Sequence, residues 1–275
     1  MSTGGLVETG RRGKGSGVDL FSVDGKVAVV TGGTRGIGLM IVRGLLQGGA
    51  RKVYISSRKA DACAAAEKEL SSYGDVTAIP ADLSTEPECR RLADEVGAAE
   101  NELHILANNA GATWGTPLAE FTSDAWDKVM DTNLKGPFFL TRSFLPLLEK
   151  AASDDDPARV INIGSIDGLH VNPMPHYPYS ASKAGIHHLT RVLARELGPK
   201  RITVNAVAPG PFPSKMMAFA LDDPSTRGAI EAGNPLGRIG RPDDMAGIAV
   251  FLSSRAGSYV NGAVIPVDGG ISAVV

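Results

Sequence analysis

Seven short runs of β-forming residues alternate with longer helical patterns over most of the chain. The runs are apolar throughout and do not alternate with polar residues, which is typical of strands buried on both faces of a parallel sheet. Parallel neighbours need long crossover connections, and the helical segments supply them. We predict strands at 27–31, 52–56, 76–80, 104–108, 159–164, 202–207 and 264–267, and helices near 36–48, 60–73, 86–100, 123–150, 178–198 and 242–253.

This order of elements predicts a single α/β domain of the Rossmann-like kind, with a doubly wound parallel sheet of about seven strands and helices on both faces. We expect the domain to span 20–275 and the polar, glycine-rich segment 1–19 to be a flexible tail. Segment 211–235 shows no strand pattern and is rich in proline, so we expect it to form a lid over the carboxyl edge of the sheet. The run "SDDDPA" at 153–158 indicates a solvated loop.

The composition excludes several classes of function. A net charge of −2 gives no general attraction to nucleic acid or to anionic membranes. No segment approaches the roughly 20 apolar residues of a membrane span. The two cysteines, Cys63 and Cys89, have no zinc-ligand spacing and make a poor disulfide framework, which favours free thiols in a reducing compartment. We therefore expect a cytoplasmic protein with no bound metal, no nucleic acid partner and no membrane partner.

A glycine-rich turn follows the first predicted strand, in the stretch "VAVVTGGTRGIG". Gly32, Gly36 and Gly38 give the spacing Gly-x3-Gly-x-Gly just before a predicted helix. Such a turn lets the backbone approach a pyrophosphate, and the helix N-terminus offers free N–H groups and a positive dipole end. A tight turn that only packs against its neighbours is the alternative.

Five further motifs lie at predicted strand ends or on the helices that follow: "NNAG", "NLKG", "INIGS", "YSASK" and "NAVAPG", starting at 108, 133, 161, 179 and 205. In this order and spacing they resemble those of the short-chain dehydrogenase/reductase family over about residues 21–270. The stretches "NNAGATWG", "INIGS" and "APGPFPSKM" resemble most the bacterial 3-ketoacyl reductases of the rhamnolipid type. The resemblance favours a dinucleotide as the occupant of the glycine turn.

Tyr179 and Lys183 are four residues apart on a predicted helix and so share one face. An ammonium beside a phenol favours the phenolate, so we expect Lys183 to lower the pKa of Tyr179. The resemblance implies that Tyr179 donates a proton to a carbonyl oxygen and that Lys183 also holds the nicotinamide ribose. It further implies that Ser165 hydrogen-bonds the same oxygen and that Asn133 supports a water-linked proton path to Lys183.

The expected cofactor is NADP(H). Ser57 stands where NAD enzymes of this fold carry an acid, Arg58 follows it, and Arg35 lies in the glycine turn, so two guanidinium groups are available for a 2′-phosphate. The resemblance places the adenine beside Asp82 and Leu83. The complete expected set of cofactor-binding residues is Gly32, Thr34, Arg35, Gly36, Ile37, Gly38, Ser57, Arg58, Asp82, Leu83, Asn109, Ala110, Gly111, Tyr179, Lys183, Pro209, Gly210, Phe212 and Ser214.

The segment between the serine strand and the tyrosine helix is expected to line the substrate mouth, through Asp167, His170, Asn172, Met174 and His176. Tyr177 is expected to form a wall of the pocket, and Trp114 is either a substrate contact or a loop anchor. We expect His187 and His188 to have ordinary packing or surface roles.

These observations predict an NADP(H)-dependent oxidoreductase that reduces a carbonyl to an alcohol, with a 3-ketoacyl thioester (3-oxoacyl-ACP reductase-like) as the leading substrate. Another small ketone or alcohol, such as a steroid, polyol or xenobiotic, and a non-catalytic NADP sensor are the alternatives. An intact Ser165, Tyr179 and Lys183 set argues against the sensor. By resemblance we expect a homotetramer or homodimer that pairs through helices 123–150 and 178–198.

Overall fold

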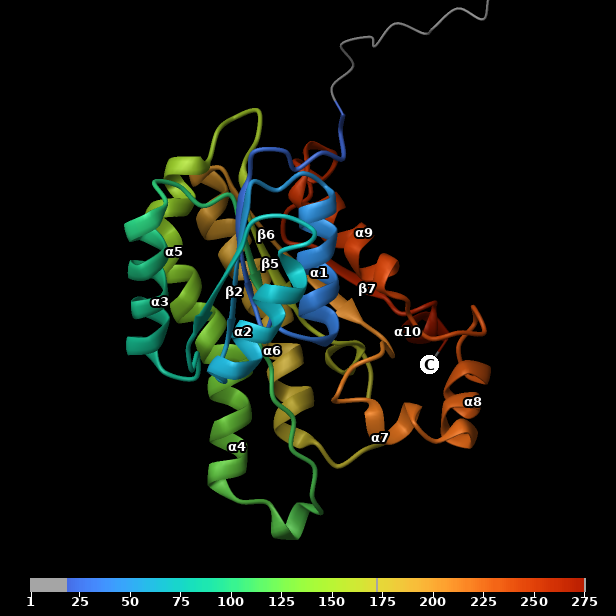
Figure 1. The fold of residues 1–275 in the computed structure, drawn as a ribbon. Coiled ribbons are helices and arrows are strands. Elements are labelled where there is room, and N and C mark those ends of the chain that lie inside the picture. The colour runs from blue at the N-terminus through green and yellow to red at the C-terminus, as the bar shows by residue number, and fades with distance from the viewer. Residues whose placement is uncertain (1–18, 172, 275) are drawn as a thin grey trace, which may run out of the picture.

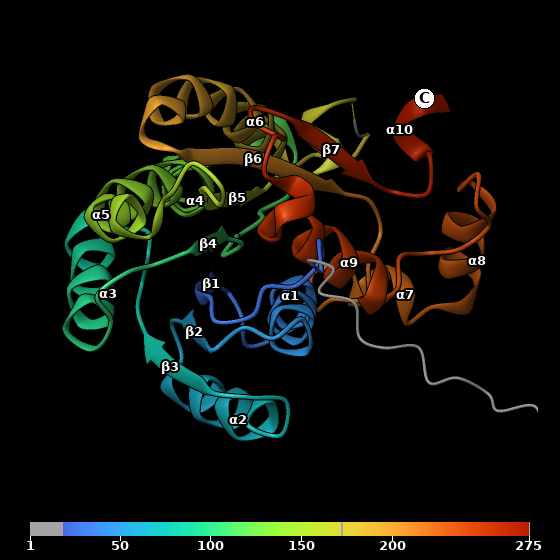
Figure 2. The ribbon, with the colours of Figure 1, turned by 90° about the horizontal axis from the view of Figure 1, so that it is seen from above.

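A computed structural model describes residues 19–171 and 173–274, so most of the expected tail, 1–18, and Asn172 lie outside the described residues. Seven parallel strands form one sheet in the order β3-β2-β1-β4-β5-β6-β7 (Figures 1 and 2). The chain winds outward from β1 to β3 and then returns to build the other half from β4 to β7. The strands are β1 (Val27–Thr31), β2 (Lys52–Ser57), β3 (Val76–Pro80), β4 (Ile105–Asn108), β5 (Ala158–Ile163), β6 (Ile202–Pro209) and β7 (Val264–Val267).

Helices cover both faces of the sheet because the central strands are apolar on both faces (Figure 2). One core cluster joins the sheet to α1 (Gly36–Gln47), α2 (Ala60–Leu70) and α9 (Pro242–Ser253). The other joins it to α3 (Glu86–Ala99), α5 (Gly136–Ala151) and α6 (Tyr177–Leu197). The predicted doubly wound, single-domain fold is confirmed. Within the described residues no helix is long and apolar enough to cross a membrane.

The predicted helix 123–150 is not continuous. It consists of α4 (Ser123–Met130), a π-helical turn at Asp131–Lys135 and then α5. Pro137 has no N–H, so the carbonyl of Asn133 loses its usual α-helical donor, and a change of helical register at this point costs little. The sequence pattern missed the interruption because apolar residues continue across it.

The lid predicted at 211–235 contains two short helices, α7 (Ala218–Leu221) and α8 (Pro224–Ala232). Asp223 caps the second, since its Oδ2 accepts a hydrogen bond from the Thr226 N–H at 2.7 Å. In Figure 1 these helices and α4 lie toward the lower end of the molecule, where α6 begins. A short C-terminal helix, α10 (Ile271–Val274), follows β7.

The loop 153–158 is not simply solvated, because Asp156 joins two buried cations. It accepts hydrogen bonds from Lys26 at 2.8 Å and from Arg159 at 2.9 Å. Arg159 is 1% exposed and also donates to the carbonyl oxygens of Leu252 and Ser254, which ties β5 to the end of α9.

Changing Asp156 to alanine is expected to lower the free energy of unfolding by roughly 2–3 kcal/mol. Loss of the carboxylate leaves Lys26 and Arg159 as unpaired buried charges, and the partial exposure of Asp156 holds the cost near the lower end of the range for buried pairs. Urea denaturation at a fixed protein concentration measures the change. Asp155→Ala, at the exposed neighbouring position, is the matched control, and equal stability of the two variants would reject the structural role.

Candidate active site

The glycine turn is held against the end of β4. The Thr31 hydroxyl oxygen accepts hydrogen bonds from the N–H groups of Asn109 and Ala110, both at 2.9 Å. The Asn109 side-chain amide donates to the carbonyl oxygens of Thr31 and Gly32. Asn109 was expected on the nicotinamide side of the cofactor. In the structure its side-chain nitrogen supports the glycine turn through these two hydrogen bonds.

The glycines of this turn are required by its shape. Gly32 and Gly36 have φ angles of +65° and +54°, which L side chains rarely adopt. A Cβ atom added at Gly38 would lie 2.2 Å from the Gly32 carbonyl oxygen. Helix α1 begins directly after the turn, and its N-cap residue Arg35 makes no side-chain cap, so the first N–H groups of the helix are available to an anion. The turn therefore fits a pyrophosphate.

The segment after β6 lies opposite the glycine turn, and the two together form a cradle for the dinucleotide, called the glycine cradle below. A Cβ added at Gly36 would lie 3.3 Å from the Cβ of Ser214, so this loop closes over the glycine turn. The Ser214 hydroxyl oxygen accepts a hydrogen bond from the Met217 N–H at 3.3 Å. Gly210, just after Pro209, donates its N–H to the Val267 carbonyl oxygen, which holds the start of the loop on β7.

Two expected cofactor residues have their side chains in the core. Phe212 is 2% exposed and its ring packs against Gly240, where an added Cβ would lie 2.4 Å away. Leu83 is also buried, whereas its neighbour Asp82 is exposed and accepts hydrogen bonds from Ser84. Leu83 and Phe212 can therefore contact a cofactor only through their backbone atoms.

The end of β2 carries no acid. Ser57 is the last residue of the strand, Arg58 follows it, and Thr34 and Arg35 lie in the turn between β1 and α1. Arg35 and Arg58 are both exposed, and within the described part of the chain neither forms an ion pair. Both guanidinium groups are thus available to an anionic ligand.

Asn133 lies in the π-helical turn and is 2% exposed. Its Oδ1 accepts the Ala112 N–H at 2.8 Å, and its Nδ2 donates to the Ala112 carbonyl oxygen and to the Ser182 hydroxyl oxygen. The side chain therefore fastens the loop after β4 to helix α6. A Cβ added at Gly111 would lie 3.9 Å from Lys183 Nζ, so this loop also lies beside the lysine.

Ser165, Tyr179 and Lys183 meet at the end of β5 and the first turns of α6. The side chain of Ser165 hydrogen-bonds the Tyr179 hydroxyl. Lys183 is buried, its Nζ donates to the Ile163 carbonyl oxygen at 2.8 Å, and the same atom lies 5.5 Å from the centre of the Tyr179 ring. The structure thus brings the predicted catalytic residues together.

The expectation that Lys183 lowers the pKa of Tyr179 is not met in this structure. The tyrosine as a whole is only partly buried, but its hydroxyl is desolvated, and this burial raises its pKa to about 12 against the opposing effect of the Ser165 hydrogen bond. Burial also lowers the pKa of Lys183 to about 8, and the lysine does not offset the desolvation of the Tyr179 hydroxyl. At neutral pH Tyr179 is therefore a protonated phenol, the form that can donate a proton.

Two residues expected at the substrate mouth lie deeper than predicted. The side chains of Asp167 and His176 are only 9% and 10% exposed, and Asp167 Oδ2 lies 3.6 Å from His176 Nδ1. The His176 ring packs edge-on against Tyr179, with ring centres 5.5 Å apart. Met174, by contrast, is 45% exposed, as expected for a residue at an opening.

The two histidines on α6 differ from each other. His187 is buried beside Gly164, and burial is the main reason that its pKa falls to about 4, so it is a neutral packing residue. His188 lies on the exposed side of the helix. Ordinary packing and surface positions were predicted for this pair.

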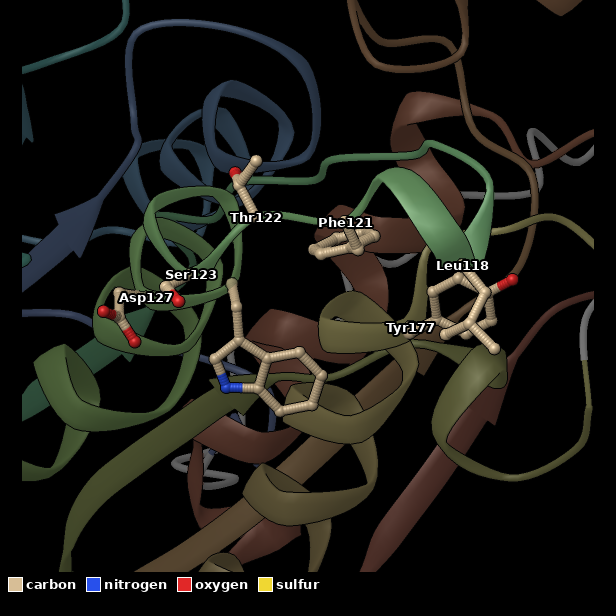
Figure 3. A pocket seen from close by; sticks show the side chains of 7 residues that line it. Leu118, Phe121, Thr122, Ser123, Asp127 and Tyr177 are labelled. Carbon is tan, nitrogen blue, oxygen red and sulfur yellow. The ribbon is translucent and has the colours of Figure 1, made fainter.

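A pocket of about 490 Å³ lies between α4 and the start of α6 (Figure 3). Phe121 and Tyr177 meet edge-on in its wall with ring centres 5.8 Å apart, and Leu118 and Trp126 add further apolar surface. Tyr177 lines this pocket, whereas Ser165, Tyr179 and Lys183 do not, so its expected place in the wall of the substrate pocket stays a prediction. Trp114 is 45% exposed, and the Lys128 ammonium lies 5.1 Å from its ring centre.

Comparison with known proteins identifies relatives over nearly the whole chain. The chain is 49% identical over 250 residues to the rhamnolipids biosynthesis 3-oxoacyl-[acyl-carrier-protein] reductase of Pseudomonas aeruginosa, covering 91% of this chain and 97% of that protein. The solved RhlG/NADP active-site complex of Pseudomonas aeruginosa has a TM-score of 0.89, 49% identity, and coverage of 92% and 98% of the two chains. A Burkholderia cenocepacia gluconate 5-dehydrogenase in complex with NADP and tartrate has a TM-score of 0.85, 31% identity, and coverage of 94% and 99%.

The family model described as Enoyl-(Acyl carrier protein) reductase matches residues 32–272, which run from the glycine turn to the last helix. The matched region includes the glycine turn, the asparagine in the π-helical turn and the cluster of Ser165, Tyr179 and Lys183. With relatives at this level of identity and coverage, the chain belongs to the short-chain dehydrogenase/reductase family.

Proposed function

We propose that the protein is an NADP(H)-dependent reductase that converts a 3-oxoacyl thioester to the corresponding 3-hydroxyacyl thioester. The observation that carries the reaction type is the position of the Tyr179 hydroxyl beside Ser165 and Lys183, together with a glycine turn that fits a dinucleotide. The substrate class follows from the 49% identity to a 3-oxoacyl-[acyl-carrier-protein] reductase over almost the entire length of both chains.

The backbone of the glycine turn and the N-terminus of α1 hold the pyrophosphate, and Arg35 and Arg58 hold the ribose phosphate. When bound, the reduced dinucleotide supplies the hydride for the substrate's carbonyl carbon. Tyr179 donates its hydroxyl proton to the carbonyl oxygen, and Ser165 positions that oxygen by a hydrogen bond. Lys183 binds the nicotinamide ribose and, together with Asn133, returns a proton to Tyr179 from solvent.

Absorbance at 340 nm tests the proposal. Purified protein with NADPH is given 3-oxoacyl thioesters of increasing chain length, in parallel with 2-keto sugar acids, polyols and steroid ketones. We expect the thioesters to be reduced with the highest kcat/KM. Faster turnover of a sugar acid or polyol would show that 3-oxoacyl thioesters are not the substrate class of this protein. NADPH binding with no turnover of any carbonyl compound would support the sensor alternative.

We also propose that the protein is a cytoplasmic homotetramer with a single cofactor-binding domain at 20–275 and a lid at 211–235. Its two cysteines are buried free thiols, as a reducing compartment would leave them. The helices expected at the interfaces expose large apolar side chains, namely Trp126 on α4, Phe138 on α5 and Val192 on α6. In contrast, Leu140 and Phe144 of α5 are buried in the protein's own core.

Light scattering at micromolar concentration is expected to give a mass close to four times the 28.6 kDa of the chain. Phe138→Glu is expected to weaken assembly because it places a charge on the exposed face of α5. Tyr73→Glu changes an aromatic residue of similar exposure beyond the end of α2 and is the control. A monomeric wild-type protein would reject the proposed assembly.

A further inference from the structure

A histidine lies against Tyr179 and takes no part in the proton transfer described above. His176 is the N-cap residue of α6, three positions before the tyrosine. Its ring packs edge-on against the ring of Tyr179, with 5.5 Å between the ring centres. His176 is 8% exposed. The fold therefore places an imidazole next to the group that is proposed to donate the proton.

Two loops at the carboxyl edge of the sheet hold this histidine in place. In the loop after β4, Thr116 donates its N–H to the Pro175 carbonyl oxygen at 3.2 Å, and a Cβ added at Gly115 would lie 4.0 Å from the Cβ of His176. The turn after β5 carries Asp167, whose Oδ2 lies 3.6 Å from His176 Nδ1. Ligands of doubly wound folds bind beyond this edge of the sheet, so the imidazole lies in the region that a reacting ketone enters.

The carboxylate determines which ring nitrogen is left for a ligand. Nδ1 of His176 is buried on the side of Asp167. A carboxylate accepts hydrogen bonds, so it favours a proton on the nitrogen that faces it. Nε2, across the ring, is then the nitrogen that can meet a substrate, and it is a hydrogen-bond donor when the ring carries its second proton. In that form the ring offers a cationic donor beside Tyr179.

A 3-oxoacyl thioester has two carbonyl groups separated by one carbon. In the proposed reaction the ketone oxygen meets Tyr179 and Ser165, and the thioester oxygen must then lie close to the same two side chains. A ketone with a single carbonyl has no oxygen at this second position. A donor beside Tyr179 would therefore distinguish the two kinds of substrate, because a site built to bind an oxygen rejects an analogue that lacks it.

We propose that His176, oriented by Asp167, is a specificity-determining residue that donates a hydrogen bond to the second carbonyl oxygen of a 1,3-dicarbonyl substrate. This rests on the proposed function and names the feature of the substrate that the site recognises. With the second oxygen bound at His176, the ketone has fewer orientations to sample and its oxygen is held toward Tyr179. A hydrogen bond from a charged donor corresponds to about tenfold to a hundredfold in binding.

The test measures substrate selectivity. Reduction of ethyl 3-oxohexanoate and of the N-acetylcysteamine thioester of the same acid is compared with reduction of 2-octanone, which has one carbonyl. The assays are run at about pH 6, on the acid side of the histidine range. His176→Phe keeps an aromatic ring beside Tyr179 but has no donor, whereas His176→Gln keeps an N–H donor. His188→Phe changes an exposed histidine of the same helix and is the control.

We expect His176→Phe to lower the ratio of kcat/KM for each 3-oxo compound to that for 2-octanone by at least ~10-fold, the effect of one charge-assisted hydrogen bond. His176→Gln is expected to restore most of the ratio, and His188→Phe to keep the wild-type ratio. Equal losses with the 3-oxo compounds and with 2-octanone would overturn the proposal, because His176 would then only support the shape of the site. The ester has the same two carbonyls without the sulfur, so its ratio tests His176 even if the thioester is not reduced, a result that would reject the proposed substrate class.

A binding measurement removes turnover from the test. In a Tyr179→Phe background with NADPH bound, quenching of the cofactor fluorescence gives the Kd of the two 3-oxo compounds. We expect the addition of His176→Phe to weaken their binding by about tenfold and the addition of His188→Phe to leave it unchanged. A Kd that is the same with and without the imidazole of His176 would show that this ring does not bind the second carbonyl.

Discussion

Replacing Tyr179 with phenylalanine is expected to lower turnover at least ~100-fold, in line with the contribution of a positioned general acid. The phenylalanine ring keeps the edge-on contact with His176 but has no proton for the substrate oxygen. NADPH binding is expected to change little, because the glycine turn and Lys183 are untouched. The loss should therefore appear in kcat, and KM should change little.

Steady-state kinetics at 340 nm and fluorescence titration with NADPH measure these two quantities separately. Tyr73→Phe, which removes a hydroxyl from an exposed tyrosine far from the site, is the matched control and should retain wild-type turnover. If Tyr179→Phe turned over at near wild-type rate, Tyr179 would not be the acid. If it also lost NADPH affinity, the defect would be one of binding.

Much of the fold can be predicted from the sequence, because each strand is a short apolar run that must be buried on both faces. The predicted bounds of β1, β3 and β7 agree with the structure, and that of β4 differs by one residue. His104 lies outside β4, although its ring nitrogen Nδ1 accepts the Val27 N–H. The order of strands follows from the crossover rule, which places the motif-bearing strand ends at one edge of the sheet.

The local motifs also predicted which side chains meet at the site, since family patterns record spatial neighbours. They did not predict the surroundings of these side chains. The direction of the Tyr179 pKa depends on how far its hydroxyl is desolvated, and burial depends on the packing of segments distant in sequence. The brace formed by Asn109 and the buried position of Phe212 are tertiary features of the same kind.

Asp167 and Asp156 illustrate the limit for charged residues. Both lie in polar stretches that read as loops, where an acid is most often solvated. In the structure Asp156 pairs with Lys26 and Arg159, and Asp167 lies beside His176. The residues that contact each aspartate do not all lie at helical or strand spacings from it. Periodicity in the sequence therefore could not predict these contacts.

The preference for NADPH over NADH is expected to depend on Arg35 and Arg58. Arg35 precedes the first turn of α1 and Arg58 follows the end of β2, and the two elements flank the edge of the cradle where the ribose of a dinucleotide lies in this fold. With Ser57 in the position of the usual acid, no carboxylate there repels a 2′-phosphate. We expect Arg58→Ala to weaken the preference and the double variant with Arg35→Ala to weaken it further.

A charge-assisted hydrogen bond contributes about 1.5–3 kcal/mol, and about 1.4 kcal/mol corresponds to tenfold in binding. Because both arginines are exposed and solvent screens them, each is expected to contribute near the lower figure, or about tenfold in the ratio of kcat/KM for NADPH to that for NADH. The change should lie in the NADPH term, since NADH has no 2′-phosphate to lose. Arg90→Ala, which removes an exposed arginine on α3, controls for net charge. Equal efficiency of wild-type protein with the two cofactors, or an unchanged ratio in the double variant, would show that these guanidinium groups do not bind the phosphate.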